Sequence, residues 1–426
     1  MESEANSFTF LQLSDIHLDS PQNSGVLSYS TAQCQARYAD FLETFVNALT
    51  LAQNHQVDAV FIVGGLWNHL SIRSQIVTTV LEAIEQIAPI PVYITPSDTD
   101  PFTADSYYNP RYLQALGMRS WPENAVVFAS DNFTTVNHPA RDDVTVTGRA
   151  ARKLGQDLTN YLEEPINISQ RSMVNILLHH GTVDIYQGTE SSDPSRVTAP
   201  FSVDELDNQR FTYAALGHCH DYMEVENADG ILIGAYSGTL AGRNFEELGP
   251  RGAIHGSIQS LADGTTTLEL NPIEVARNRI MYIGVDITGL DEEMIKEEIL
   301  LYLEEVDVHP EDDIVALSLE GRLSRETQVD SIIEQLKNEF YHLIVVNRTR
   351  PDYLSEQRDQ RTTEHKFIEK MLESIQEAEE KRRLSPTSDS LTGIPGALIS
   401  GKTIEDALYY GLDALKKKKV TVRHVD

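Results

Sequence analysis

Leu11-Gln-Leu-Ser-Asp15-Ile-His17-Leu-Asp19-Ser-Pro21 gives the first indication of the fold. An apolar run that begins at Phe8 alternates with polar residues and stops at the Asp15-x-His17 pair. This pattern is typical of a buried strand that carries two metal ligands at its C-terminal end. In an open α/β sheet, functional sites lie just outside the carboxyl ends of the strands. A surface Asp and a surface His at a strand-to-loop junction would give the same pattern, so the interpretation depends on the later strand ends.

Strands and helices alternate after this stretch, as is typical of parallel βαβ units. Short β segments then recur between residues 125 and 270, and they predict a second sheet packed against the first. The sequence therefore predicts an α/β fold with a main domain over residues 1–275. The alternating elements are a helix over 33–53, a strand over 57–63, a helix over 72–87 and a strand over 91–95.

The character of the sequence changes near residue 276. A strand–helix–strand–helix–strand pattern predicts a small α/β domain over residues 276–350. After Pro351 the chain becomes polar and charged, and residues 385–401 are rich in Ser, Thr, Pro and Gly, as in a flexible linker. Residues 351–426 are therefore expected to form a linker and a helical tail.

Two amphipathic helices are predicted in this tail, over 366–381 and 403–416. An isolated apolar stripe must be covered, either by the body of the chain or by another protein. The linker between the two helices favours docking of the last helix on a partner, by helix-in-groove recognition. The residues expected to bind the partner are Ile404, Leu408, Leu412 and Leu415.

The composition restricts the partners and the compartment. The chain of 426 residues has 65 acidic and 34 basic residues, a formal charge of −31. Such a protein repels nucleic acid on average, so contact with DNA is expected only through a local basic patch, metal ions or a partner. Two cysteines, no signal-peptide pattern at the start and no long apolar run lead us to expect a cytoplasmic protein that does not enter a membrane.

Histidines recur at the ends of later predicted strands. The strand from Val174 ends in His179-His180, and the strand from Tyr213 ends in His218-Cys-His220. A single His after a strand is usually structural, but three such strand ends in one chain indicate a metal centre. Imidazole and carboxylate ligands together suit Mn, Fe or Zn rather than Ca. The Cys between His218 and His220 is expected to point into the core.

The order of these blocks resembles the calcineurin-like metallophosphoesterases, and more narrowly the SbcD-type nuclease subunits of DNA repair. The family pattern runs D-x-H, G-D-x-x-D, G-N-H-D, L-H-G, G-H-x-H and Y-S-G, and the resemblance covers about residues 8–275. It implies a four-layer α/β/β/α sandwich, a small α/β cap domain over 276–350 and a tail that binds an SbcC-type coiled-coil ATPase. The corresponding blocks are Asp15-Ile-His17, Gly64-Gly65-Leu66-Trp67-Asn68, Ser97-Asp98-Thr99-Asp100, Leu178-His179-His180-Gly181, Gly217-His218-Cys219-His220 and Tyr236-Ser237-Gly238.

Two blocks depart from the family pattern. Gly65 stands where the family has an Asp that bridges both metals, and Asn68 replaces a further Asp. Asp98 and Thr99 stand where the family has an Asn ligand and a His that acts on the reacting phosphate. Asp98 can still bind a metal, whereas Thr99 cannot act as an acid near neutral pH. No residue is therefore assigned a certain catalytic role.

The resemblance divides the remaining ligands into two sets of three. Asp15, His17 and His220 form one set, and the other consists of Asp98, His180 and His218. Three ligands suffice for one catalytic-type metal with an open position. Without a bridge, two cations ~3.5–4 Å apart lose the shared negative charge that offsets their repulsion. The expected cofactor is Mn²⁺ or another divalent transition metal, as one or two ions or none.

Three functions are compatible with these residues. The first is an SbcD-like subunit with impaired or lost hydrolysis, which is expected to form a homodimer, to work with an SbcC-type ATPase and to reach DNA through that complex. The second is an active metal-dependent DNA nuclease that has rebuilt its site with Asp98 and a carboxylate such as Asp19 or Asp100. The third is a phosphoesterase for a small phosphodiester, against which the SbcD-like cap and tail argue.

Overall fold

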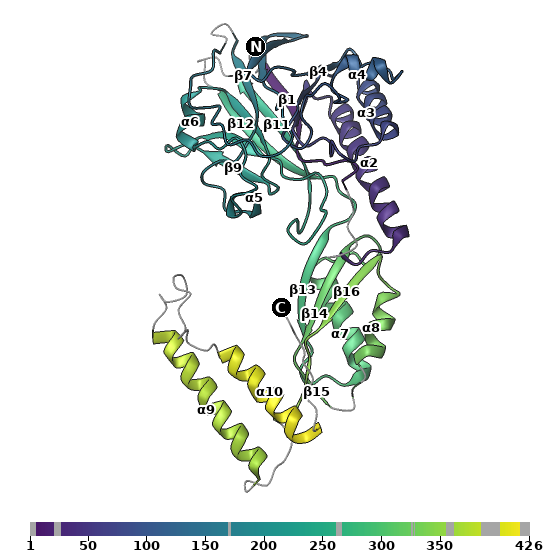
Figure 1. Cartoon of the computed structure of the whole chain (residues 1–426), viewed down its shortest axis with the longest axis vertical. Helices are drawn as coiled ribbons and strands as arrows, with labels where there is room; N and C mark the ends of the chain where they lie inside the picture. Colours follow the sequence, from purple (N-terminus) through teal and green to yellow (C-terminus); the bar gives the residue numbers. More distant parts are fainter. Residues whose placement is uncertain are drawn as a thin grey trace, which may run out of the picture. The chain divides into compact units, whose positions relative to one another are not determined.

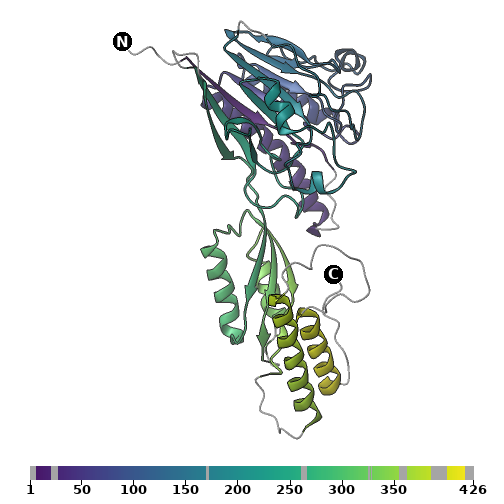
Figure 2. The same cartoon turned by 90° about the vertical axis from the view of Figure 1, so that its left-hand side faces the viewer.

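The computed structural model describes residues 6–20, 27–168, 172–260, 266–324, 327, 329–354, 362–384 and 401–417. The chain forms two compact units (Figures 1 and 2). The first comprises residues 1–281 and 312–314, and the second residues 282–311 and 315–426. The predicted boundaries at 275 and 350 stay predictions, and the predicted linker up to residue 400 lies outside the described residues. None of the described helices combines the length and the apolar character that crossing a membrane requires.

The first unit contains a mixed six-stranded sheet in the order β12-β11-β1-β2-β3-β4. Strands β1 to β4 are parallel neighbours, whereas β11 runs antiparallel to both β1 and β12. The sequence predicted β11 and β12 as strands but counted them with the second sheet. β11 fits beside β1 because Gly256, opposite Phe10, has no Cβ that would collide with the Phe10 ring. The strands are β1 (Asn6–Leu13), β2 (Ala59–Val63), β3 (Val92–Thr95), β4 (Ala125–Val127), β11 (Gly252–Ser260) and β12 (Thr266–Glu274).

The second sheet of this unit also has six strands, in the order β5-β6-β7-β8-β10-β9. The four central strands β6, β7, β8 and β10 are parallel, and the two outer strands are antiparallel to their neighbours. The outer strands β5 and β9 were not predicted from the sequence. The strands are β5 (Thr134–His138), β6 (Arg141–Gly148), β7 (Val174–His180), β8 (Tyr213–Gly217), β9 (Met223–Glu226) and β10 (Leu232–Tyr236).

The predicted four-layer α/β/β/α sandwich is confirmed. Helices α2 (Thr31–Asn54) and α3 (Ser74–Gln86) pack on the outer face of the first sheet. In Figure 1 they lie on the opposite side of the sheets from the short helices α5 (Thr189–Ser192) and α6 (Val203–Asn208), which with loops cover the second sheet. The short helix α4 (Pro110–Ala115) also belongs to this unit. The alternation in β1 sorts its side chains between layers: Phe8 and Phe10 face the second sheet, and Leu11 and Leu13 face the helices.

Polar side chains join the two sheets near the ends of their parallel strands. The Gln12 amide donates to the carbonyl oxygens of Leu216 (3.1 Å) and Ala235 (2.9 Å), and it accepts a hydrogen bond from the Tyr213 hydroxyl. Ser14 directly follows β1, and its hydroxyl oxygen lies 3.0 Å from the hydroxyl oxygen of Ser237. Because buried polar groups are costly unless they are paired, these contacts specify how the two sheets align. They bring the carboxyl ends of β1, β8 and β10 together.

The second unit contains a three-stranded sheet in the order β13-β14-β16. Two helices alternate with its strands, as the strand–helix–strand–helix–strand pattern predicted. A two-stranded pairing of β15 (Arg322–Leu323) with β17 (Arg350–Pro351) follows. The elements of the alternating part are β13 (Ile280–Asp286), α7 (Glu292–Glu305), β14 (Ile314–Glu320), α8 (Val329–Lys337) and β16 (His342–Asn347).

Helices α9 (Thr363–Leu384) and α10 (Gly401–Lys417) lie side by side in both views (Figures 1 and 2). Leu408 and Leu412 of α10 are buried in a small core with Tyr353 and Ile368. The same chain therefore covers half of the stripe that the sequence assigned to a partner. Of the other two stripe residues, Ile404 is half-buried and Leu415 is 48% exposed.

Candidate metal centre

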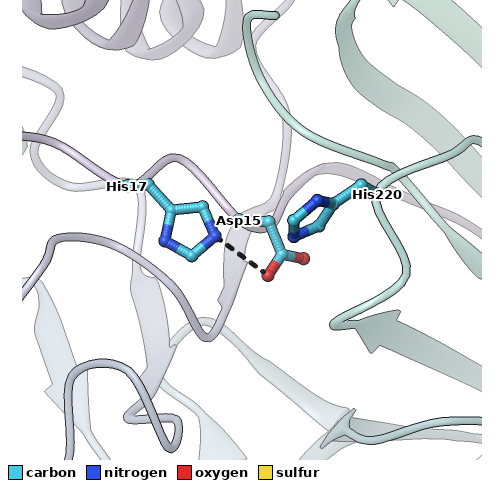
Figure 3. Close-up of side chains that lie close together, drawn as sticks. All are labelled: Asp15, His17 and His220. Atoms are coloured by element: carbon cyan, nitrogen blue, oxygen red, sulfur yellow. Dashed lines mark ion pairs between the residues drawn. The ribbon is translucent and has the colours of Figure 1, made fainter. Parts of the chain in front are cut away.

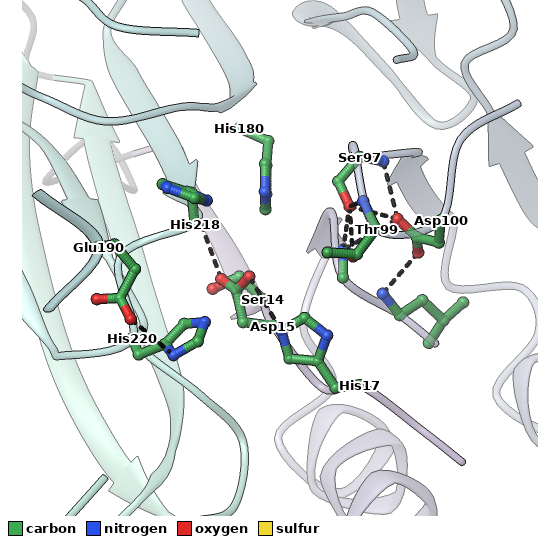
Figure 4. A network of polar contacts seen from close by, with 12 residues as sticks. Ser14, Asp15, His17, Ser97, Thr99, Asp100, His180, Glu190, His218 and His220 are labelled. Atoms are coloured by element: carbon green, nitrogen blue, oxygen red, sulfur yellow. Dashed lines mark hydrogen bonds and ion pairs between the residues drawn. The ribbon is translucent and has the colours of Figure 1, made fainter. Parts of the chain in front are cut away.

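Six strand-end side chains of the first unit converge in two groups, and Figure 4 labels all of them except Asp98. Within each group, one ligand atom per residue lies within 4.8 Å of the others. The groups are the two sets that the sequence predicted. The first triad is Asp15, His17 and His220, and the second triad is Asp98, His180 and His218. The convergence is observed, and the binding of a metal by these residues stays a prediction.

Three of these ligands lie on left-handed backbone. Their φ angles are 48° for Asp15, 50° for His17 and 100° for His218, values that residues other than glycine rarely adopt. Such strain persists only where surrounding contacts over-determine it, and it clusters at functional sites. Here the Asp15 amide donates to the Gly64 carbonyl oxygen (3.1 Å), and the His218 amide donates to the Asp15 carboxylate (2.8 Å).

Gly64 and Gly65 form the tightest part of the centre. Both have positive φ, at +74° and +62°. A Cβ on Gly65 would lie 2.8 Å from the Asp15 Cα, and a Cβ on Gly64 would lie 2.3 Å from His180 Nδ1. Backbone therefore fills the place where the family pattern has a bridging carboxylate, and a side chain at residue 65 would have to displace the Asp15 loop.

The two carboxylates considered as replacements have other partners. The fully buried Asp100 accepts hydrogen bonds from the Leu66 amide (2.7 Å) and the Tyr108 hydroxyl (2.7 Å), so it anchors the loop after β2. Asp19 accepts from the Arg73 guanidinium, at 2.8 Å from Nε, and from the Arg73 amide. Neither belongs to a triad, so their contacts do not support a rebuilt bridge.

The second triad presents bare ligand atoms. His180 Nδ1 donates to the Val63 carbonyl oxygen (3.0 Å), which leaves Nε2 pointing at Asp98 Oδ1, 3.4 Å away. The buried atoms Asp98 Oδ1 and His218 Nε2 have no hydrogen-bond partner. A ligating His that donates its other ring N–H to a carbonyl is the usual arrangement in metal sites. Unpaired buried acceptors are costly, so these residues fit a divalent transition metal.

The pKa values of the second triad show how its charges interact. Burial and the neighbouring His180 lower the pKa of His218 to about 3, so this imidazole is neutral and able to ligate. Burial would also lower the pKa of His180, but Asp98, Asp15 and the Val63 carbonyl outweigh it and raise that pKa to about 9. The carboxylates therefore favour the protonated form of His180 when no metal is bound.

The first triad is enclosed by other charged groups. His17 Nε2 lies 3.7 Å from Asp15 Oδ1 (Figure 3). His220 Nδ1 lies 3.0 Å from a carboxylate oxygen of Glu190 and 3.0 Å from one of Glu247. His17 Nε2 has no hydrogen-bond partner, and burial holds the pKa of His17 well below its usual value.

Sequence reasoning missed three residues of this enclosure: Glu190, Arg243 and Glu247. The buried Glu247 pairs with the Arg243 guanidinium, whose Nη2 lies 3.2 Å from His220 Nδ1. Burial would raise the pKa of Glu247, but Arg243 holds it well below its usual value. An Arg and a Glu four residues apart are common on protein surfaces, so the sequence carried no signal that this pair lies at the centre.

The other histidine and cysteine of these blocks lie in the core. His179 is fully buried against Phe133 and Phe201, and Cys219 is buried in the cluster behind the second sheet. The triads themselves line a cavity of about 570 Å³, together with Thr99, Arg196 and Arg243. Arginine side chains beside metal ligands are suited to bind a phosphate group.

Comparisons with known proteins give structural likeness only. No protein-family model matches the chain, and no curated protein matches it. A dimetal phosphatase from Danio rerio aligns with 12% identity over 59% of this chain and 95% of its own, with a TM-score of 0.35. A protein from Thermus thermophilus aligns with 12% identity over 62% of this chain and 99% of its own, with a TM-score of 0.32. A purple acid phosphatase from yellow lupin (Lupinus luteus) seeds aligns with 11% identity over 63% and 52%, with a TM-score of 0.36. These values are too low for a function to be inferred from them.

Proposed function

We propose that this chain is an SbcD-like metallophosphoesterase subunit in which two-metal phosphodiester hydrolysis is impaired or lost. The order of the motifs and the convergence of six ligands support the metallophosphoesterase assignment. The observation that supports the loss is the space at Gly65, where the family pattern has the bridging Asp: a Cβ there would lie only 2.8 Å from the Asp15 Cα. Two adjacent cations without a shared anion repel each other.

The residues of the second triad have distinct roles in this proposal. Asp98, His180 and His218 hold the metal, and the Val63 carbonyl orients His180. A divalent metal bound there supplies Lewis acidity and an activated water. Thr99, whose hydroxyl lies 3.0 Å from the Ser97 hydroxyl, has no proton to give a leaving group near neutral pH. General acid help is worth ~10²–10⁴-fold, so its absence alone slows hydrolysis strongly.

The partner in this proposal is an SbcC-type coiled-coil ATPase, and DNA is reached through the complex. The net charge of −31 disfavours binding of DNA by this chain alone. The exposed Leu415 and the half-buried Ile404 on α10 are the stripe residues left for docking. Truncation of residues 403–426 should abolish co-purification with the ATPase, whereas Leu116→Ala, an exposed position on the first unit, should not. Unchanged co-purification after truncation would refute the docking.

An active DNA nuclease is the second candidate, and one observation favours it. Asp98 Oδ1 is buried without a hydrogen-bond partner, where the family pattern has a neutral Asn. Its carboxylate supplies one negative charge that partly replaces the missing bridge.

A nuclease assay decides between the two candidates. Purified protein with millimolar Mn²⁺ should leave linear DNA undegraded, with metal content measured on the same sample. His218→Ala is the matched control for contamination, because it removes a ligand of the second triad. Degradation by the natural protein that His218→Ala abolishes would establish the active nuclease and contradict impaired hydrolysis.

A further inference from the structure

We propose that Arg243 replaces one of the two metal ions, so that the chain holds a single divalent cation, in the second triad. The guanidinium supplies fixed positive charge beside the first triad. The inference rests on the proposed function in one respect, that the second triad is a metal site.

The position of Arg243 is the first observation. Its Nη2 lies 3.2 Å from Nδ1 and 3.5 Å from Nε2 of His220, so a cation already contacts a ligand of the first triad. The Arg243 side chain is 19% exposed, and Glu247 holds it through contacts to Nε (3.0 Å) and the backbone amide (2.7 Å). A bidentate, partly buried pair of this kind fixes the guanidinium in place.

The second observation is that His220 Nδ1 already contacts two carboxylates, which leaves Nε2, 3.5 Å from Arg243 Nη2, as the nitrogen for a metal. Both Glu190 and Glu247 place a carboxylate oxygen 3.0 Å from its Nδ1. A metal bound to His220 needs a metal–nitrogen distance of ~2.0–2.1 Å, which would bring it beside the guanidinium. Two cations that close repel strongly in a site of reduced dielectric.

The two glutamates differ in how their charge is balanced. Glu247 is paired with Arg243, the cation nearest the first triad. Glu190 accepts from the Tyr186 hydroxyl (2.8 Å), and Arg196, whose Nη1 lies 3.9 Å away, pairs more closely with Glu246 (3.0 Å). In the second triad, by contrast, the group paired with Asp98 is His180, a ligand of the same triad, whose Nε2 lies 3.4 Å from Asp98 Oδ1. The two triads therefore differ in the cation they are built for.

Metal stoichiometry tests the inference without an activity assay. Protein loaded with excess Mn²⁺ and desalted should contain about one ion per chain by elemental analysis. His218→Ala should lose the ion, and His17→Ala, the matched change in the first triad, should keep it. Arg243→Met should raise the content toward two ions, whereas Arg196→Met should leave it at one.

Each other result overturns a different statement. Two ions in the natural protein, with one lost in His17→Ala, would refute the inference and leave the metallophosphoesterase proposal intact. No ion in the natural protein would refute the inference, because the second triad would not be a metal site, and would leave lost hydrolysis as the proposed function. A single ion in folded Arg243→Met would refute the role of Arg243 in excluding the second metal.

Discussion

The two triads contain the same residue types at equivalent places, yet their surroundings differ. Each has one Asp and two His at the carboxyl ends of parallel strands. In the second triad a carbonyl oxygen orients His180, and two facing ligand atoms are unpaired. In the first triad Glu190, Glu247 and Arg243 surround His220. The comparison shows that ligand identity alone does not define a metal site, because the neighbouring charges decide what it can bind.

The largest expected difference between the triads is the effect of removing a ligand on Mn²⁺ affinity. Asp98→Ala removes the only carboxylate of the second triad and should lower Mn²⁺ affinity at least ~100-fold, measured by titration calorimetry. His17→Ala, in the first triad, should leave the affinity nearly unchanged. Equal weakening in both variants would show that the triads act as one dinuclear centre.

In the metal-free protein, the pH dependence of the free energy of unfolding should reflect the protonation of His180 in the second triad. The pKa of His180 is about 9 in the folded chain, above its ordinary value of 6.5, so its protonated form stabilises the fold. This contribution is fully present below pH 6.5 and is lost as pH rises through 9, by at most ~3 kcal/mol. Burial lowers the pKa of His17 and His218, and their contribution changes only below pH 6.5.

Urea unfolding of chelator-treated protein between pH 6.5 and 9.5 measures this change. Asp98→Asn is the control, because it removes the carboxylate that raises the pKa of His180. In Asp98→Asn, the free energy of unfolding should fall much less between pH 6.5 and 9.5 than in the natural protein. A decline of the same size in Asp98→Asn would assign it to other groups.

Substitutions of Gly64 and Gly65 should have the smallest effects, and these effects should differ between the two triads. Gly64→Ala and Gly65→Ala each place an L-residue at positive φ and should lower the free energy of unfolding by about 1–2 kcal/mol or more. The Gly64 Cβ would meet His180 of the second triad first, and the Gly65 Cβ would meet Asp15 of the first triad, so Gly64→Ala should weaken Mn²⁺ binding more. Thermal unfolding with and without Mn²⁺ separates the two effects.

Gly117→Ala is the control for backbone conformation. Its φ is +69°, and a Cβ there would meet nothing within 4 Å. The excess destabilisation of Gly65→Ala over Gly117→Ala therefore measures the close approach to Asp15. Equal effects would mean that the loop yields easily and could accept a bridging Asp.

Most strands and helices could be predicted from sequence patterns, whereas the two sets of three ligands came from the family resemblance. Apolar periodicity is local, and the Asp15-x-His17 and His218-x-His220 pairs follow directly from the ends of their strands. The bounds predicted for most elements agree with the structure within a few residues, because apolar periodicity is local. The periodicity did not place the two pairs side by side, because β1 and β8 belong to different sheets.

The assignment of strands to sheets and the residues around each triad became known only from the folded structure. β11 joins the first sheet through pairing with β1, more than 200 residues away, and Leu412 is buried against residues before the predicted linker. Glu190 of α5 and the loop residues His220 and Arg243 are far apart in the sequence and meet only in the folded chain. These contacts depend on long-range packing and charge pairing, which leave no periodic trace in the sequence.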